Sequence, residues 1–158
     1  MSSNFLNAKK GISIFKSDNA DVPFINVAAS GTTDATTANK LVDSTASFGG
    51  NVVEVGDIVY NTTDSTAATV TAIDSDTTLS LNADIIASGK AYTIYKGNKN
   101  EGCLVYVGGT GDINCVTAGG TTLLFKNVAV GILGGTCPVQ VKKILSTSTS
   151  ATLLLGLW

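Results

Sequence analysis

The chain of 158 residues contains no histidine and no arginine, and all ten of its basic residues are lysines. The missing imidazole excludes a histidine acid–base catalyst and histidine ligands for a metal ion. The missing guanidinium excludes bidentate contacts to phosphate, and a net charge of −2 offers no basic surface to nucleic acid. We therefore expect a protein that is not an enzyme, binds no nucleic acid and uses no cofactor or metal ion.

Charged and aromatic residues are also scarce, at 14% and 6% of the chain. Threonine, serine and glycine are abundant, with 21, 14 and 17 residues, and there are only 2 prolines. A hydrophobic fraction of 44% is typical of a folded chain rather than a disordered one. No apolar run reaches the roughly 20 residues of a membrane-spanning helix, and residues 1–10 lack the apolar core of a signal peptide. We expect synthesis in the cytoplasm and no membrane association.

Three motifs invite a chemical interpretation, and each is better explained as a turn. The glycine-rich run at 108–111 lacks the lysine and the following helix of a phosphate-binding loop. The pair Asp74 and Asp76 lacks the central glycine and closing glutamate of a calcium loop. Cys103, Cys115 and Cys137 are odd in number and form no C-x-x-C pair, which favours unpaired thiols over a zinc site or a disulfide.

Charge divides the chain into three segments. Residues 1–37 form an arm in which three lysines balance three aspartates. Residues 38–97 carry seven acidic residues and three lysines, and residues 98–158 are nearly uncharged. We expect an N-terminal arm (1–37) that packs partly on the C-terminal module, an acidic inserted module (38–97) and a C-terminal module (98–158).

Short β segments separated by turn residues fill both modules. In the acidic module, residues 51–60, 67–73, 78–81 and 91–95 have the β-branched content or the period-two alternation of strands. Their spacing predicts an SH3-like or other small barrel. Residues 104–107, 112–117, 121–126, 139–145 and 151–158 predict a C-terminal β-sandwich or meander of about five antiparallel strands. The predicted fold class is all-β, with little helix.

A nearly uncharged module needs an explanation for its solubility, and burial in an assembly provides one. The chain ends on an apolar run at 153–158, and the arm carries apolar residues without forming a closed unit. Such an arm either adds a strand to its own C-terminal module or pairs with a partner chain. The candidate assembly residues are Phe5, Leu6, Ile12, Ile14, Phe15, Leu157 and Trp158.

The ordered motifs of the C-terminal module resemble a known class of proteins. These motifs are LVYVGGTGD at 104–112, VTAGGT at 116–121, FKNV at 125–128, PVQV at 138–141 and the ending at 150–158. They resemble the head-spike-base and decoration-type structural proteins of tailed bacteriophages and gene transfer agents. The motifs at 40–44, 55–59, 68–73 and 91–95 resemble a module of virion proteins from marine phages, including cyanophages.

The resemblance implies a non-enzymatic virion protein on the capsid exterior, acting as a capsid decoration (cement) or head-spike component. It implies binding to the major capsid protein and to further copies of itself, as a homotrimer by analogy with phage appendages, and it leaves room for other virion proteins as partners. The alternatives are a tail, baseplate or fibre-base component, or a host-surface module that binds glycans. For glycan binding, the candidate aromatic residues are Tyr60, Tyr92 and Tyr95.

Overall fold

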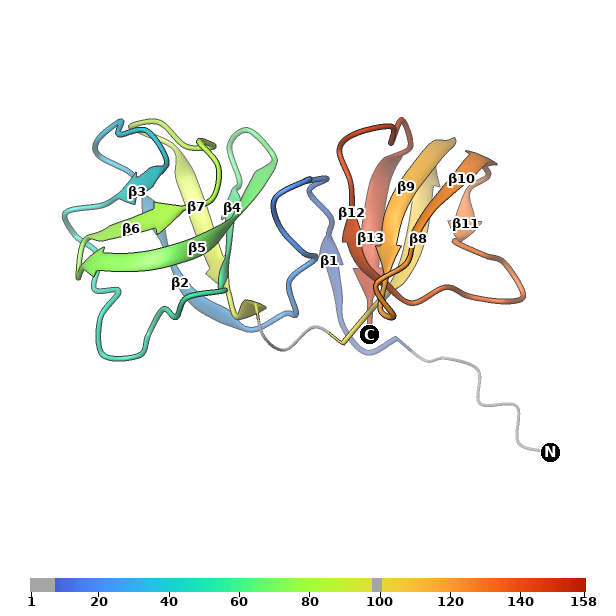
Figure 1. Cartoon of the computed structure of the whole chain (residues 1–158), viewed down its shortest axis with the longest axis horizontal. Coiled ribbons are helices and arrows are strands. Elements are labelled where there is room, and N and C mark those ends of the chain that lie inside the picture. Colours follow the sequence, from blue (N-terminus) through green and yellow to red (C-terminus); the bar gives the residue numbers. More distant parts are fainter. Residues whose placement is uncertain (1–7, 98–100) are drawn as a thin grey trace. The chain divides into compact units, whose positions relative to one another are not determined.

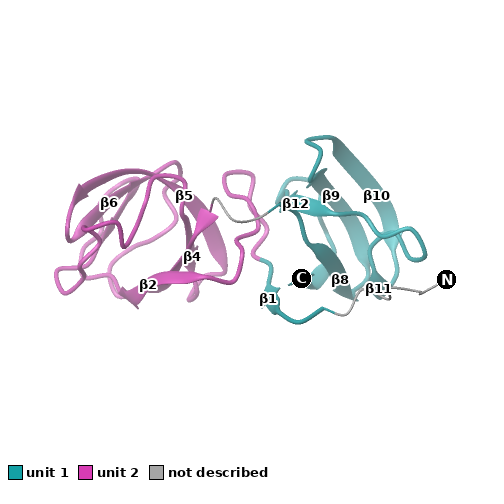
Figure 2. Cartoon of the chain, turned by 90° about the horizontal axis from the view of Figure 1, so that it is seen from below, with its two compact units in different colours: residues 1–14, 101–158 teal, residues 15–100 magenta. Residues whose placement is uncertain are grey.

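The structure is a computed structural model that describes residues 8–97 and 101–158. The described residues form thirteen strands, and every strand pairing among them is antiparallel (Figure 1). The all-β prediction is therefore confirmed. The chain divides into two compact units: unit 1 is Met1–Ile14 with Glu101–Trp158, and unit 2 is Phe15–Asn100 (Figure 2). In the described part of the chain, no helix has the length and apolar character required to span a membrane.

Unit 1 is built from two sheets. The four-stranded sheet has the order β1-β13-β8-β11, and the three-stranded sheet has the order β10-β9-β12. Their bounds are β1 Gly11–Ser13, β8 Leu104–Gly109, β11 Gly131–Ile132 and β13 Thr152–Leu157 in the first sheet, and β9 Gly111–Thr117, β10 Thr122–Val128 and β12 Val141–Ile144 in the second. Consecutive strands β8 and β9 lie in different sheets, so the module is a sandwich rather than a sequential meander.

The core of unit 1 lies between these sheets and follows the alternation of their strands. Val105 and Val107 of β8 and Leu154 of β13 are buried on one side. Ile113 and Cys115 of β9 are buried on the other, and Ile144 of β12 joins them. In each strand the residues between these positions point to the opposite face, because successive side chains of a strand alternate.

Unit 2 is one curled sheet of six strands with the order β2-β7-β4-β5-β6-β3. Their bounds are β2 Val27–Thr32, β3 Lys40–Val42, β4 Ile58–Asn61, β5 Thr66–Ser75, β6 Thr78–Leu81 and β7 Ala91–Tyr95. The ends of the order approach each other, because the Asp34 N–H, just after β2, donates to the Val42 carbonyl of β3 at 3.0 Å. Eleven residues form the enclosed core: Leu41, Phe48, Val53, Val59, Ala68, Val70, Leu79, Leu81, Ile86, Tyr92 and Ile94.

Two buried carboxylates hold unit 2 together. Asp43 is 3% exposed and accepts hydrogen bonds from the Tyr92 hydroxyl at 2.7 Å and from the Thr45 N–H and hydroxyl. Asp57 is 1% exposed, accepts the Gly97 N–H at 3.1 Å and pairs with Lys96 Nζ at 3.2 Å. Because a buried charge is costly unless it is paired and hydrogen-bonded, these contacts fix the ends of β7 to the loops before β4.

The segment expected as an N-terminal arm is divided between the units. Gly11–Ser13 forms β1 and pairs with β13 of unit 1. Val27–Thr32, expected within the same arm, forms β2 and pairs with β7 of unit 2. The division of the chain therefore falls between Ile14 and Phe15 rather than after residue 37. Each part of the segment completes a sheet whose other strands come from later in the chain, a long-range effect that local composition does not encode.

Candidate assembly surface

Three leucines of β13 lie on the face of the four-stranded sheet that points away from the core. Leu154 and Gly156 are buried, so the alternation places Leu153, Leu155 and Leu157 on the outer face. Leu153 is 75% exposed and Leu155 is 37% exposed. We call these three residues the leucine stripe.

Leu153 has an unusual backbone conformation for its residue type. Its φ of 52° lies in the left-handed region, which is unfavourable for leucine by roughly 1 kcal/mol. The strand next to it accommodates this residue with a glycine: a Cβ at Gly108 would lie 2.8 Å from the Leu153 Cβ. Backbone strain of this kind is found preferentially at functional sites. A strained, exposed leucine beside a glycine is therefore a candidate contact residue.

Side chains from neighbouring strands extend the stripe. The register pairs Leu155 with Tyr106 and Leu157 with Leu104, both of β8. Tyr106 is paired in turn with Ile132 of β11. Because cross-strand partners share a face, a row of apolar side chains crosses three strands of this sheet.

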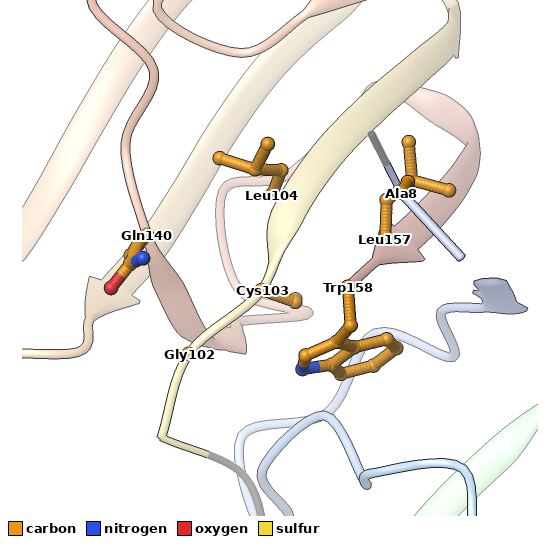
Figure 3. Close-up of a pocket in the computed structure, with 7 residues that line it drawn as sticks. All are labelled: Ala8, Gly102, Cys103, Leu104, Gln140, Leu157 and Trp158. Carbon is orange, nitrogen blue, oxygen red and sulfur yellow. The ribbon is translucent and has the colours of Figure 1, made fainter. Parts of the chain in front are cut away.

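A pocket of about 240 Å³ opens where the stripe ends, beside the start of β8 (Figure 3). It is lined by Ala8, Gly102, Cys103, Leu104, Gln140, Leu157 and Trp158. The Trp158 indole and the Leu157 side chain come from the end of β13, and Leu104 and Cys103 come from the start of β8. The volume is below the roughly 300–1,000 Å³ of typical small-molecule sites. It suits an apolar side chain of a protein partner, of the kind that anchors an interface.

The cysteine in this pocket is not an activated nucleophile. Cys103 is 2% exposed, its Sγ donates to the Val141 carbonyl at 3.4 Å, and burial raises the pKa of its thiol to about 12. Burial also raises the pKa of Cys115 to about 11. Both thiols are protonated at neutral pH, whereas nucleophilic and metal-binding cysteines act as thiolates. Within the described residues, no group of three or more cysteine, aspartate or glutamate side chains is placed to hold a metal ion.

The two units carry opposite net charge. The residues of unit 1 include five lysines and two acidic residues, for a net charge of +3. The residues of unit 2 include five lysines and ten acidic residues, for a net charge of −5. The leucine stripe therefore belongs to the unit with few carboxylates, which lowers the desolvation cost of covering it.

The residues expected at an assembly interface have different environments. Ile12 lies in β1 opposite Gly156, and the N–H of the buried Ile14 donates to the Leu154 carbonyl at 2.8 Å. Trp158 is joined to the same segment, since its carbonyl accepts the Lys9 and Lys10 N–H groups. The structure thus brings Ile12, Ile14, Leu157 and Trp158 together in unit 1.

The other three residues of that set do not join this cluster. Phe15 belongs to unit 2, where its ring stacks on Tyr60 with centroids 4.4 Å apart. Phe5 and Leu6 lie outside the described residues. The expected set also omitted Leu153, Leu155, Leu104, Tyr106 and Ile132, which form the outer face of the sheet. The apolar run at 153–158 was the sequence signal for Leu153 and Leu155, and it does not show which of its leucines face outward.

Two of the three tyrosines considered for glycan binding are buried and offer no exposed aromatic face. Tyr60 and Tyr92 are each 2% exposed. The Tyr60 ring packs edge-on against Tyr95 with centroids 5.4 Å apart, and Tyr92 packs against Phe48. Tyr92 is part of the enclosed core of unit 2, whereas Tyr60 is buried between the rings of Phe15 and Tyr95.

Comparisons with known proteins gave no match to a protein-family model, a curated protein or a solved structure. The features of this chain that bear on its function are the leucine stripe, the adjoining pocket and the sequence resemblance.

Proposed function

We propose that this chain is a non-enzymatic structural protein of a tailed-phage virion, a capsid decoration or head-spike component that stabilises the head. In this proposal unit 1 binds the major capsid protein through the leucine stripe and the pocket. Unit 2, which carries most of the acidic residues, remains in contact with solvent. The sequence motifs of residues 104–158 favour this class of protein, and the outer face of the four-stranded sheet carries the proposal.

The observation that carries it is Leu153, which is 75% exposed at a strained φ of 52°. Full burial of a leucine contributes about 1.5–3 kcal/mol, so covering the exposed three quarters of Leu153 contributes roughly 1–2 kcal/mol to binding. The neighbouring Leu155 and Tyr106 add apolar area around it. A pocket of single-side-chain size at the end of the stripe offers an anchor point.

Charge supports the assignment of the two units. Most of the acidic residues belong to unit 2, where several form exposed ion pairs such as Lys40 with Asp74 and Lys90 with Asp64. A surface of this kind keeps a protein soluble. Unit 1 has few charges to hydrate, which suits the side that an assembly covers.

The first test locates the protein in purified virions of a phage that encodes it. Mass spectrometry measures its presence and cryo-electron microscopy measures its position. We expect copies on the exterior of the head. Absence from the virion would refute the proposal, and copies found only on the tail would reassign it to a tail, baseplate or fibre-base component.

The second test uses two matched variants in a binding assay with capsids that lack the protein. Leu153→Asp places a charge in the stripe at a position whose backbone conformation aspartate tolerates. Val55→Asp makes the same kind of change at a residue of unit 2 that is 64% exposed. We expect Leu153→Asp to weaken binding at least about tenfold, equivalent to about 1.4 kcal/mol, and Val55→Asp to bind like the wild type. Equal effects of the two variants would remove the stripe from the binding surface.

A further inference from the structure

Strand β10 is an edge of the three-stranded sheet of unit 1. It pairs with β9 on one side, and no strand among the described residues pairs with its other side. It is seven residues long and contains Leu123, Leu124 and Phe125 in succession. Long apolar edges are uncommon in monomeric proteins, because their unpaired backbone groups pair readily with another chain.

The direction of the backbone groups in β10 follows from the hairpin that precedes it. The Thr117 N–H donates to the Thr121 carbonyl at 2.9 Å, so this pair is hydrogen-bonded. Hydrogen-bonded pairs recur at every second residue of an antiparallel ladder. Leu123 and Phe125 therefore direct their backbone groups to β9, and Thr122 and Leu124 direct theirs to the open side. The register with β9 shifts between Phe125 and Val128, so this regular alternation ends at Phe125.

The side chains of β10 are also incompletely covered. Leu123 is paired with Cys115 and Phe125 with Ile113, so both lie on the face that points into the sandwich. Leu123 nevertheless remains 37% exposed, because the opposite sheet ends at β11, which has only two residues. On the outer face, Leu124 is 49% exposed. The sandwich is thus left open along this edge.

Charge identifies the occupant that fits. Lys126 is the only charged residue of β10, and its Nζ pairs with Asp112 at 2.7 Å. The same carboxylate accepts the Asn127 N–H at 2.9 Å. Because Asp112 of the same chain neutralises Lys126, β10 can lie beside β10 of a second copy without repulsion between like charges. No charge on β10 favours a strongly charged partner.

We propose that β10 pairs antiparallel with β10 of a second copy of this chain, about a two-fold axis at Leu124. The two Leu124 residues then exchange their outward N–H and carbonyl groups as a hydrogen-bonded pair. Leu123 lies opposite Phe125 of the second copy, which covers the exposed core leucine. The paired segment is 122–125, which precedes the register shift of β10, and the pairing joins the two three-stranded sheets edge to edge.

This pairing is independent of the proposed capsid attachment, which uses the other sheet of unit 1. Its symmetry also differs from the homotrimer that the sequence resemblance implies, since an isologous contact joins copies in pairs. The oligomeric state and the geometry of the contact can therefore be tested without a virion.

A single cysteine provides the geometric test. Across the axis, the Leu124 Cα atoms would lie about 5.5 Å apart, inside the range of about 4.4–6.8 Å that a disulfide requires. The two Leu123 Cα atoms would lie about 8 Å apart, because they are offset by two residues along the strand. The full chain would carry Cys137→Ser, which removes the one exposed thiol, together with either Leu124→Cys or Leu123→Cys.

Under mild oxidation we expect Leu124→Cys to form a covalent dimer at least about tenfold faster than Leu123→Cys. Equal rates, or no dimer from Leu124→Cys, would overturn the pairing. By light scattering or analytical ultracentrifugation, the wild type should have about twice the chain mass of 16.1 kDa. Leu124→Lys, which places two like charges at the axis, should have the mass of a single chain, and Leu153→Lys on the other sheet should remain a dimer. A wild-type monomer at millimolar concentration, or an oligomer that Leu124→Lys leaves intact, would overturn it.

Discussion

Replacing Leu153 by asparagine should stabilise unit 1, although the change removes a large apolar side chain. Leucine at a φ of 52° is strained by roughly 1 kcal/mol, and asparagine tolerates this region. Leu153 is 75% exposed, so the substitution forfeits only a quarter of a leucine's burial, or roughly 0.5 kcal/mol. The expected net change is a gain of about 0.5 kcal/mol in the free energy of unfolding, which raises Tm by roughly 2–4 °C.

The chain has a built-in probe for this measurement, because Trp158 is its single tryptophan and belongs to unit 1. Its fluorescence during thermal or urea unfolding reports that unit. Leu155→Asn is the matched control: Leu155 is 37% exposed and its φ is not positive, so the same change loses more burial and relieves no strain. We expect Leu155→Asn to destabilise unit 1 by about 1–2 kcal/mol.

Equal destabilisation of unit 1 by Leu153→Asn and Leu155→Asn would show that Leu153 is not strained. Leu153→Asn should change stability and binding in opposite directions: it should unfold at a higher temperature than the wild type and bind capsids more weakly. Stability and binding that change in the same direction would show that Leu153 is an ordinary structural residue of β13.

Three further predictions concern the buried polar groups. Tyr92→Phe should destabilise unit 2 by about 2 kcal/mol at pH 7, because it removes a buried hydrogen bond to the Asp43 carboxylate. Burial alone would raise the pKa of Asp43, but the hydrogen bonds that its carboxylate accepts from Thr45 and Tyr92 lower the pKa below 3.8. The stabilisation of the folded state by these bonds is complete above pH 3.8 and is lost as the pH falls through the lowered pKa. The destabilisation caused by Tyr92→Phe should therefore become smaller in that acidic range. Lys96→Met should destabilise unit 2 by about 3 kcal/mol, because it leaves the carboxylate of Asp57 buried without its cation. Burial would lower the pKa of Lys96, but Glu54 and Asp57 raise it above 10.5, so the wild type should lose this stabilisation only as the pH rises through that raised pKa. A thiol reagent should label Cys137 rapidly in the native protein and reach Cys103 and Cys115 only after unfolding.

Chemical denaturation can contradict the predictions for Tyr92→Phe and Lys96→Met, and thiol labelling can contradict the prediction for the cysteines. A Tyr92→Phe effect that stays constant from pH 7 to pH 2 would mean that the hydroxyl does not stabilise the ionised carboxylate. A Lys96→Met variant as stable as the wild type would mean that the backbone N–H groups alone compensate the buried charge of Asp57. Rapid labelling of two or three thiols in the native state would contradict the burial of Cys103 and Cys115.

Much of the secondary structure could be predicted from the sequence, because it is encoded locally. Alternation placed strands at 67–73, 78–81 and 91–95, and the structure has β5, β6 and β7 at those positions. A glycine turn at 119–120 separates β9 from β10 as expected, but the turn expected at 108–111 does not form. Gly108 and Gly109 belong to β8, Gly111 belongs to β9, and these two strands lie in different sheets. The two-residue β11 and the three-residue β3 had no such signal, because strands this short exist only through their partners.

The assembly residues were predicted less completely. Leu157 and Trp158 were selected because they end an apolar run, and both line the pocket. Leu153 was part of the same run, but its exposure depends on Gly108 across the sheet and on a backbone angle that the sequence does not specify. Tyr92 failed as a surface residue because the curled sheet encloses it, and Tyr60 failed because Phe15 and Tyr95 cover its ring.

Composition and local residue order were enough to predict the all-β fold class, the small number of catalytic side chains and the contrast between an acidic and a nearly uncharged region. These properties depend on residue types and on their local order. Tertiary structure alone decided which strands share a sheet, that residues 11–13 and 27–32 serve different units, and which leucines remain exposed. The physical reason is that strand pairing joins segments far apart in the chain, as β1 joins β13, and only this pairing determines which face of each strand is covered.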